Sequence, residues 1–497
     1  MSPESLAFCC SLALPEPSNH DKAADADRLK EGMARRGLQP VTMPLDILQR
    51  LSGELRRNGF ALDIGLGHAE RGFRILALDV HDIYGISLDI GTTTMEASLH
   101  DLRDKKMVYA SEIENPQIAF GADVLSRAQG AMSGEGVRLI QALRDGVNRL
   151  IGSLCKYAGV DAGNIYALAV AGNTIMSHFF LGLDVRNVPV KPYTPAAGSA
   201  VLCSAGEIGV HINPHAVVYV FPNAGSYVGG DIISGILSAE IHTKPDPVLF
   251  MDVGTNVEIA VGCKDWIMVG AGAAGPALEG GIADIGKKAG KGTISKVSID
   301  RTTKEPVLTV ISGGEPEGIC GTGLIDLVSE LYAAGIIDQA GKFISGAKGV
   351  LLGDGGPAYE VCRSHGKALL FTERELRNFL RSKAGMFAFL KVFLRSVGLN
   401  IGDIQQIYVA GALGCGMNIE SAVHIGMIPD INRDRIIPIG NASLKGASML
   451  LNNASLAKEV ELIRSLITYR EMSEEAELLN ELQGALFIPH TDPEKLK

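Results

Sequence analysis

The fold is decided by Gly85-Ile86-Ser87-Leu88-Asp89-Ile90-Gly91-Thr92-Thr93, because a similar stretch recurs as Val248-Leu249-Phe250-Met251-Asp252-Val253-Gly254-Thr255-Asn256. In both copies a largely apolar strand enters an Asp-x-Gly-Thr turn, and a second strand-like run follows, at residues 95–99 and 257–261. One turn of this kind is a weak signal, whereas two equivalent copies indicate an internal duplication. The sequence therefore predicts two related halves.

A second pair of matching segments supports the duplication. One predicted helix runs through Gly159 into a strand at 165–170 that ends Ala171-Gly172-Asn173, and another runs through Gly398 into a strand at 407–409 that ends Ala410-Gly411-Ala412. The apolar faces of these helices are Ile140, Leu143, Val147, Ile151 and Leu154 in the first, and Leu376, Leu380, Phe387, Leu390 and Leu394 in the second. Two such α/β halves predict a duplicated fold with a ligand-binding cleft between them.

The two Asp-x-Gly-Thr turns carry the groups that a nucleoside triphosphate needs. Backbone amides, small side chains, hydroxyls and metal-binding carboxylates together hold phosphates. We expect Asp89 and Asp252 to act in catalysis and to lie near a Mg²⁺ ion or its water shell. The predicted phosphate contacts of ATP are Gly91, Thr92, Thr93 and Thr94 in the first turn and Gly254, Thr255 and Asn256 in the second. The alternative, a pair of plain strand-ending turns, is disfavoured by the duplication.

Adenosine contacts are expected from two glycine-rich turns of the second half. Gly318-Ile319-Cys320-Gly321-Thr322-Gly323 precedes a predicted helix, and Gly411-Ala412-Leu413-Gly414 follows a buried strand. The predicted contacts are Gly321, Thr322, Gly323, Gly411, Ala412 and Gly414, although either turn alone also suits ordinary helix entry. Lys383, in the helix before that strand, has two interpretations: a contact to the base or ribose, or a lysine on a solvated helix face.

Three further polar segments contain glycine where simple packing does not require it. They are Asn115-Pro116-Gln117 with Gly121-Ala122-Asp123, then Gly172-Asn173-Thr174, and Asn223-Ala224-Gly225 continuing to Gly229-Gly230-Asp231. We predict that Asn173, Gly229 and Gly230 contact the nucleotide and that Asp231 activates water, with a helix cap as the alternative role of Asp231. The residues expected to be structural are the thiols Cys320 and Cys415 and the imidazoles His178 and His424.

Composition disfavours several classes of protein. The chain has 497 residues, 46 Lys plus Arg against 56 Asp plus Glu, and a net charge of -10, which disfavours a nucleic-acid binder. Its eight cysteines include no C-x-x-C pair, so we expect reduced thiols in a cytoplasmic protein. The apolar stretch 6–14 lacks a basic leader and is too short to span a membrane, so we expect neither a signal peptide nor a membrane segment.

Four regions are expected along the chain. Residues 1–82 are predicted to form a small α/β linker or dimerisation domain, whose two amphipathic helices have apolar positions at Leu29, Met33, Leu45, Leu48 and Leu51. The first half of the duplicated fold is expected at 83–245 and the second at 246–445. A helical segment at 446–497 is expected to pack back on the duplicated fold.

In their order along the chain, these motifs resemble those of the ATP-dependent reductive activators of corrinoid proteins. The motifs are Asp89-Ile-Gly-Thr-Thr-Thr, Asn115-Pro-Gln with Gly121-Ala-Asp-Val-Leu-Ser-Arg127, Gly172-Asn-Thr, Pro222-Asn with Gly229-Gly-Asp231, Asp252-Val-Gly-Thr-Asn, Ala274-Gly-Pro-Ala-Leu-Glu-Gly280, Gly318-Ile-Cys-Gly-Thr-Gly323 and Gly440-Asn-Ala442. Both the duplicated turns and the resemblance indicate the α/β fold of actin, sugar kinases and chaperone ATPases, abbreviated ASKHA. The resemblance implies a homodimeric enzyme that uses ATP and a low-potential electron to return the cobalt of a partner corrinoid protein from inactive Co(II) to Co(I).

The sequence departs from this resemblance in its cysteines. Family members carry a ferredoxin-like N-terminal domain or cluster-binding cysteines near the C-terminus, and neither is evident here. Cys9 and Cys10 are adjacent and lack the spacing of a plant-type iron-sulfur cluster. No cluster is therefore evident in this chain, and we expect a separate electron donor such as a ferredoxin, with a cluster shared across a dimer, or no electron transfer within this chain, as the alternatives.

Other functions stay open at this point. One is an ASKHA-type activator of a radical dehydratase or reductase, with a cluster shared across a dimer. Another is a nucleotide-dependent module that binds a corrinoid protein without reducing it. A small-molecule kinase is the least favoured function, because the sequence has no sugar-recognition signature.

Overall fold

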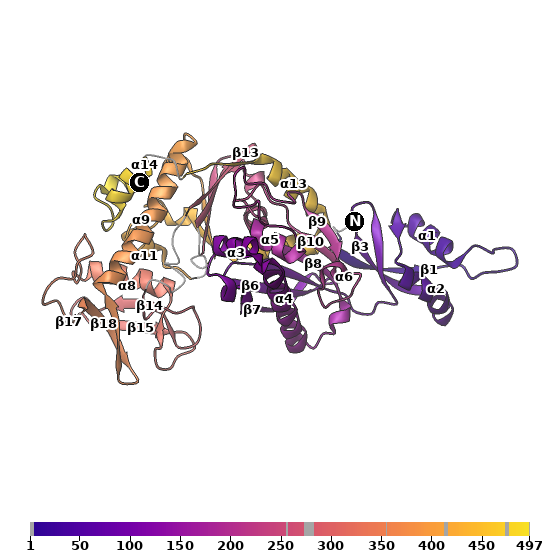
Figure 1. Cartoon of the computed structure of the whole chain (residues 1–497), viewed down its shortest axis with the longest axis horizontal. Helices are drawn as coiled ribbons and strands as arrows, with labels where there is room; N and C mark the ends of the chain where they lie inside the picture. The colour runs from indigo at the N-terminus through magenta and orange to yellow at the C-terminus, as the bar shows by residue number, and fades with distance from the viewer. Residues whose placement is uncertain are drawn as a thin grey trace. The chain divides into compact units, whose positions relative to one another are not determined.

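The computed structural model describes residues 4–254, 257–272, 283–353, 355–411, 416–472 and 477–496 (Figure 1). The chain divides into two compact units. The first unit is Met1–Ser238 with Ser443–Leu466, and the second is Ala239–Ala442 with Ile467–Lys497. The segment predicted at 446–497 is thus shared between the units, and Ser443–Leu466 belongs to the unit that contains the N-terminus.

The N-terminal part of the first unit is a four-stranded sheet covered by two helices. Its elements are β1 (Ala7–Ala13), α1 (Asp25–Arg35), β2 (Val41–Thr42), α2 (Leu45–Arg57), β3 (Ala61–His68) and β4 (Phe73–Leu78), with strand order β1-β3-β4-β2. Leu29 and Met33 are buried as predicted. In α2 the predicted Leu51 is buried together with Ile47 and Leu55, whereas the predicted Leu45 and Leu48 are 69% and 42% exposed. The buried face thus follows a spacing of four residues through Leu51, and not the spacing of three that was predicted.

The rest of the first unit surrounds a six-stranded sheet. The strands are β7 (Lys106–Glu114), β6 (Thr94–Asp101), β5 (Tyr84–Ile90), β8 (Ile165–Gly172), β10 (Val217–Val220) and β9 (Val201–Ser204), in this spatial order. The helices are α3 (Val124–Gly130), α4 (Gly136–Ala158), α5 (Thr174–Leu181), α6 (Ala205–Ile208), α7 (Gly230–Ser238), α12 (Ala442–Asn452) and α13 (Ala457–Leu466). Every residue of β8 is buried, as expected for a central parallel strand.

The second unit contains a second six-stranded sheet and two small sheets. The large sheet has the order β21 (Ile436–Gly440), β20 (Ile407–Ala410), β11 (Val248–Val253), β12 (Val257–Cys263), β13 (Trp266–Gly272) and β22 (Ile467–Tyr469). The small sheets are β15 (Pro306–Val310), β14 (Thr293–Ile299) and β16 (Gly318–Ile319), and β17 (Val350–Gly353), β18 (Gly356–Ser364) and β19 (Lys367–Thr372). The helices include α8 (Gly321–Ala333), α9 (Glu373–Ser396), α11 (Ile419–His424) and α14 (Glu477–Ala485).

The two large sheets confirm the predicted duplication. In the first, β5 pairs antiparallel with β6 and parallel with β8. In the second, β11 pairs antiparallel with β12 and parallel with β20. The predicted helices precede the parallel strands, as α4 before β8 and α9 before β20. The fold is therefore of the predicted duplicated α/β class.

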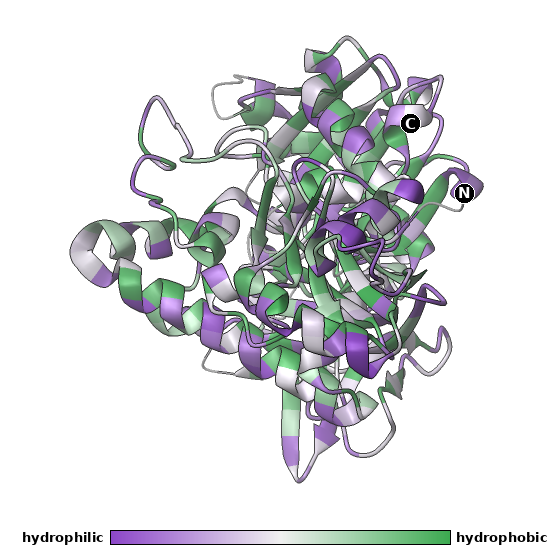
Figure 2. Cartoon of the chain, turned by 90° about the vertical axis from the view of Figure 1, so that its right-hand side faces the viewer, coloured by the Kyte–Doolittle hydropathy of each residue, from purple (hydrophilic) through white to green (hydrophobic). Residues whose placement is uncertain are grey.

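Hydropathy follows this architecture. Figure 2 shows hydrophobic colour along the sheet strands and alternating hydrophobic and hydrophilic colour along helices. Among the described helices, none has the length and hydrophobicity that crossing a bilayer requires.

Candidate nucleotide site

The first Asp-x-Gly-Thr turn follows β5, which places Asp89 near the carboxyl end of this central strand. A side chain at Gly91 is excluded, because its Cβ would lie 2.5 Å from the Thr94 carbonyl oxygen. The buried Asn115 Nδ2 donates to the Gly91 carbonyl at 2.9 Å, and the Asn115 amide donates to the Thr93 carbonyl at 2.8 Å. The predicted Asn-Pro-Gln segment therefore supports this turn from inside the protein.

Arg127 extends this buried support. Its Nε donates to the Gly121 carbonyl at 2.9 Å, and its Nη1 lies 3.4 Å from Gln117 Oε1. Burial lowers the pKa of Arg127 to about 10, so the guanidinium stays charged at neutral pH. Because Asn115, Gln117 and Arg127 are fully buried, these polar motif residues brace the turn from within.

Two other predicted segments of the first unit meet this turn. Asn173 Nδ2 donates to Thr92 Oγ1 at 3.2 Å. At Gly229 a Cβ would lie 2.4 Å from Asn173 Cα, so the backbone of residue 229 reaches Asn173 only as glycine. At Gly230 a Cβ would lie 2.7 Å from the Cβ of Phe221. Residues 91–94, 173 and 229–231, which are far apart in the sequence, thus converge in one place.

Asp231 combines partial burial with a nearby acidic group. Burial, and secondly the carboxylate of Asp89, raise the pKa of Asp231 to about 7. A carboxylate with this pKa is matched to accept a proton from water near neutral pH. Asp231 Oδ1 accepts from the Ile232 amide at 2.8 Å, whereas an N-cap side chain accepts from residues two or three positions further on. The contact therefore differs from the capping alternative.

Sequence reasoning missed Ser443, which bonds to Asp89 and to the helix that contains Asp231. Ser443 lies in α12, and its Oγ donates to Asp89 Oδ1 at 2.8 Å. Its carbonyl oxygen accepts from Ser234 Oγ at 2.7 Å, and Ser234 lies in α7, the helix whose first turn contains Asp231. In the sequence, Ser443 is marked only by the adjoining Gly440-Asn-Ala442 motif, for which no contact was predicted.

The second Asp-x-Gly-Thr turn is only partly described. Asp252 lies near the end of β11, one position before its last residue Val253, and beside Gly411, whose φ of 74° suits glycine. A Cβ at Gly411 would lie 2.5 Å from Asp252 Oδ1 and 2.6 Å from the Val253 carbonyl. Asp252, Gly254 and Gly411 thus lie around one turn, at the end of β11 and the neighbouring β20. The predicted contacts Thr255, Asn256, Ala412 and Gly414, the thiol Cys415 and the Ala274–Gly280 motif lie outside the described residues.

Gly321, Thr322 and Gly323 form the first turn of α8. A Cβ at Gly323 would lie 2.6 Å from the Ile294 carbonyl, so this glycine is required where α8 packs on β14. Thr322 Oγ1 donates to the Ser295 carbonyl at 3.3 Å. Packing accounts for Gly323, and adenosine contact by this turn stays a prediction.

Cys320, His178 and His424 were expected to be structural, and each is buried or bonded within the protein. Cys320 is 4% exposed. His178 Nδ1 lies 2.7 Å from the Thr174 carbonyl, and its Nε2 accepts from the Ala197 amide at 3.2 Å. His424 Nδ1 lies 2.9 Å from Ser329 Oγ.

The structure corrects the expectation for Lys383. Its side chain is fully buried, and Nζ donates to the carbonyls of Ala485, Phe487 and Pro489 at 2.6, 2.6 and 2.7 Å. Burial lowers the pKa of Lys383 to about 7, while the three acceptors favour the ammonium form. Because an ammonium has three donors, none is left for a nucleotide, and the solvated alternative is wrong as well. Lys383 holds the C-terminal segment.

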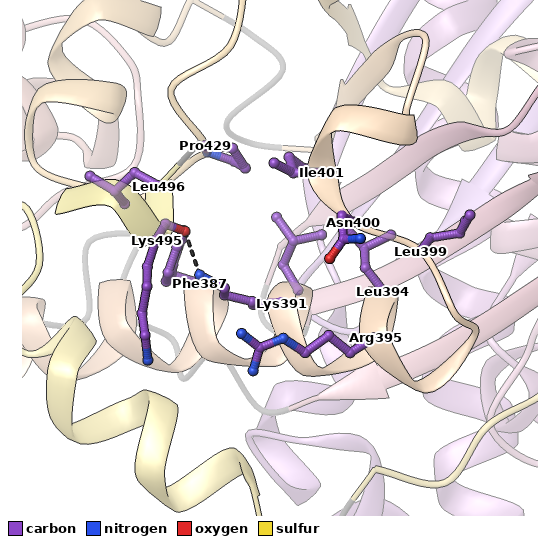
Figure 3. Close-up of a pocket in the computed structure, with 11 residues that line it drawn as sticks. Phe387, Lys391, Leu394, Arg395, Leu399, Asn400, Ile401, Pro429, Lys495 and Leu496 are labelled. Carbon is purple, nitrogen blue, oxygen red and sulfur yellow. Dashed lines mark hydrogen bonds between the residues drawn. The ribbon is translucent and has the colours of Figure 1, made fainter. Parts of the chain in front are cut away.

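A pocket in the second unit lies beside this segment (Figure 3). It is lined by α9 residues, among them Lys391 and Arg395, and by Lys495 and Leu496 near the C-terminus. Lys391 Nζ donates to the Lys495 carbonyl at 2.5 Å. The pocket volume of about 60 Å³ is far below that of a nucleotide site, and none of the predicted site residues lines it.

Comparison with known proteins supplies the family. Models of the RACo family match nearly the whole length in three parts: the RACo linker region at 4–83, the RACo middle region at 84–244 and the C-terminal ASKHA domain of RACo at 246–497. The corrinoid activation enzyme RamQ of Eubacterium limosum is 30% identical over 412 residues, which are 79% of this chain and 68% of that protein. The [Co(II) methylated amine-specific corrinoid protein] reductase of Methanosarcina barkeri is 25% identical over 80% of this chain and 75% of that protein.

A solved structure agrees with the sequence relatives. The structure described as a reductive activator for corrinoid, iron-sulfur protein is 35% identical, covers 99% of this chain and 81% of that chain, and superposes with a TM-score of 0.93. Family models, relatives and structure all confirm the resemblance that the ordered motifs predicted. The chain belongs to the RACo family of reductive activators of corrinoid proteins.

Proposed function

We propose that this chain hydrolyses ATP with Mg²⁺ and uses that reaction to return the cobalt of a corrinoid protein from Co(II) to Co(I). The electron comes from a separate low-potential donor such as a ferredoxin, and the protein works as a cytoplasmic homodimer. The observation that carries the proposal is the convergence of residues 91–94, 173 and 229–231 beside Asp89. Family membership supplies the corrinoid partner, because relatives are named for that substrate.

The converging segments suit the phosphates of ATP. At Gly91, Gly229 and Gly230 a Cβ would clash with Thr94, Asn173 and Phe221, so the glycines let these segments pack closely around the proposed phosphates. The hydroxyls of Thr92, Thr93 and Thr94 and the amide of Asn173 add hydrogen-bonding groups. Asp89 and Asp252 are the proposed Mg²⁺ residues, and a bound Mg²⁺ would neutralise phosphate charge.

In the second unit, the proposed nucleotide contacts are the predicted turns without Lys383. They are Gly254, Thr255, Asn256, Gly321, Thr322, Gly323, Gly411, Ala412 and Gly414. Gly254 and Gly411 lie around the turn that contains Asp252, and Gly321 begins α8. A helix N-terminus favours negative charge, which suits this turn for a nucleotide.

Asp231 is the proposed general base. Its raised pKa keeps it able to accept the proton of an attacking water at neutral pH. The charge of Asp89 contributes to that raised pKa. The two neighbouring carboxylates therefore suit different roles. Asp89 stays with the phosphates and metal, and Asp231 takes the proton.

ATP hydrolysis has a physical use in this reaction. Transfer of an electron to Co(II) in a corrinoid protein is strongly uphill, so it proceeds when nucleotide binding or hydrolysis favours a complex that is easier to reduce. A nucleotide can shift that equilibrium only by its different affinity for the two states. Steady ATP turnover should therefore respond to the corrinoid protein.

That response tests the proposal. We expect slow ATP hydrolysis by the full chain alone and several-fold faster hydrolysis with a Co(II) corrinoid methyltransferase protein. The measurement is phosphate release at saturating ATP and Mg²⁺, with the corrinoid-free form of the partner as control. A rate that is the same with and without the Co(II) protein would argue against coupling.

Ser443→Ala should slow ATP hydrolysis, because it removes the hydrogen bond that Ser443 donates to Asp89. A hydrogen bond to a charged group contributes about 1.5–3 kcal/mol, so we expect kcat for ATP hydrolysis to fall roughly 10-fold or more. Ser443→Thr keeps the hydroxyl and should retain most of the activity. Ser448→Ala is the matched control, because Ser448 lies in the same helix and bonds to Ser87 at 2.7 Å. Equal losses in S443A and S448A would mean that α12 matters only for packing.

A further inference from the structure

Arg127 is a fully buried charged residue of the first unit. It lies in α3 and ends the Gly121-Ala-Asp-Val-Leu-Ser-Arg127 motif, which has no role in the proposed ATP chemistry. Taking a guanidinium out of water is costly, and a folded protein normally offsets that cost by pairing the buried charge with a carboxylate. The groups around Arg127 therefore show whether the protein itself balances this charge.

The hydrogen-bond partners of Arg127 are all neutral. Nε donates to the Gly121 carbonyl at 2.9 Å, and Nη1 lies 3.4 Å from Gln117 Oε1 and 3.6 Å from the sulfur of Met176. Nη2 has no hydrogen-bond partner among the described residues. A guanidinium carries five donors, so this side chain is held in place with part of its bonding capacity unused and its charge unpaired.

A second buried arginine in the described part of the chain has the opposite arrangement. Arg28 forms an ion pair with Asp21, whose two carboxylate oxygens accept from its two terminal nitrogens. The carboxylate that acts on Arg127 is that of Asp123, but Asp123 is exposed at the N-cap of α3 and accepts from the Ser126 amide at 2.8 Å. The positive charge of Arg127 is thus poorly balanced by the protein itself.

Arg127 lies one side chain away from the first Asp-x-Gly-Thr turn. The sulfur of Met176 contacts both Arg127 Nη1 and, at 3.7 Å, Asn115 Nδ2, and the same Nδ2 donates to the Gly91 carbonyl at 2.9 Å. The Met176 amide donates to Asn173 Oδ1 at 3.0 Å. An anion held by this turn and Asn173 would therefore lie close to the guanidinium, in buried surroundings where charges interact over longer distances than in water.

We propose that Arg127 is a positioning residue whose buried charge makes the first Asp-x-Gly-Thr turn favour a nucleoside triphosphate over the diphosphate. The guanidinium acts through the turn and does not touch the nucleotide. ATP carries one more negative charge than ADP, so an unbalanced positive charge nearby stabilises bound ATP more strongly. The inference rests on the proposed ATP function and adds how the site distinguishes its substrate from its product, which is released more readily once the γ-phosphate has gone.

Nucleotide affinities of three variants test this role, with calorimetry of the full chain, Mg²⁺, ADP and the non-hydrolysable ATP analogue AMPPNP. In Arg127→Met, which keeps an apolar stem without charge, the preference for AMPPNP over ADP should fall about tenfold. Arg127→Lys keeps the charge but loses the fork of donors, and should keep most of the preference. Gln117→Met is the matched control, because it removes only neutral hydrogen bonds, to Arg127 and to the Leu139 carbonyl. It should change both affinities by the same factor.

An unchanged preference in Arg127→Met, or a preference in Arg127→Lys as low as in Arg127→Met, overturns the proposal, because Arg127 would then only brace the turn. Arg127→Gln is a second neutral variant, and the melting temperature without nucleotide checks that each variant folds. If both neutral variants fail to fold while Arg127→Lys folds, the charge serves the fold and the proposal is overturned. A wild type that binds neither nucleotide overturns the ATP function as well, whereas wild-type ATP hydrolysis with an unchanged preference in Arg127→Met overturns this inference alone.

Discussion

Asp231→Asn is expected to lower kcat for ATP hydrolysis about 10²- to 10⁴-fold, the usual contribution of a general base. Asparagine keeps the size of the side chain and loses its ability to accept a proton. Because Asp231 is proposed not to hold the phosphates, the affinity for ATP should change little. The comparison is kcat by phosphate release against nucleotide affinity by calorimetry.

The pH dependence of kcat should test more directly whether Asp231 is the general base. Burial raises the pKa of Asp231 to about 7, and the base acts only when ionised. The wild-type rate should therefore be full above that pH and decline as the pH falls through about 7. In Asp231→Asn the residual rate should lose this acidic decline.

A matched surface variant controls for the loss of one carboxylate. Asp145 is exposed on α4 in the same unit, and Asp145→Asn should keep both the rate and the pH profile. If Asp231→Asn keeps more than about a tenth of the wild-type kcat, or still shows the acidic decline, another group accepts the proton.

Lys383→Met should strongly destabilise the C-terminal segment at residues 477–496. The change removes three hydrogen bonds to the carbonyls of Ala485, Phe487 and Pro489 and leaves these buried acceptors without a donor. Each unsatisfied buried polar group costs about 1–3 kcal/mol, so we expect the C-terminal segment to lose about 3–5 kcal/mol of local stability. Methionine preserves most of the apolar volume, which separates the lost hydrogen bonds from a lost side chain.

Hydrogen exchange at residues 477–496 is the appropriate measurement, because two units need not unfold together. Lys391→Met is the control on the same helix, since Lys391 Nζ donates to the single carbonyl of Lys495 at 2.5 Å. Its effect should be smaller, about 1.5–3 kcal/mol for one hydrogen bond of a charged group. Unchanged exchange at the C-terminus of Lys383→Met would mean that these carbonyls find other donors.

The fold was predictable because it repeats. An apolar strand, an Asp-x-Gly turn and a second strand are all local features, and their recurrence at Asp89 and Asp252 specifies the duplication without any long-range contact. The convergence of Thr92, Asn173 and Gly229 follows from the same reasoning, since each ends or follows a strand of one sheet or starts a helix beside it.

The contacts that escaped prediction depend on distant segments. Ser443 is 354 residues from Asp89 along the chain, and a serine in a predicted helix gives no indication of its partner. Lys383 is ambiguous for the same reason, because its acceptors are carbonyls of a segment more than 100 residues away. In α2, the choice between Leu48 and Ile47 as the buried face depends on how the helix packs on β4, which helical spacing alone does not determine.

The most direct measurement of the proposed function is the visible spectrum of a Co(II) corrinoid protein mixed anaerobically with the full chain and a low-potential donor. Reduced ferredoxin and Ti(III) citrate serve as two donors, so that the choice of donor does not decide the outcome. We predict that the Co(II) band gives way to Co(I) only when ATP and Mg²⁺ are present, that ADP does not replace ATP, and that Asp231→Asn is inactive in the same assay. Formation of Co(I) at the same rate without nucleotide, or ATP hydrolysis that leaves the Co(II) spectrum unchanged with both donors, would contradict the proposed function.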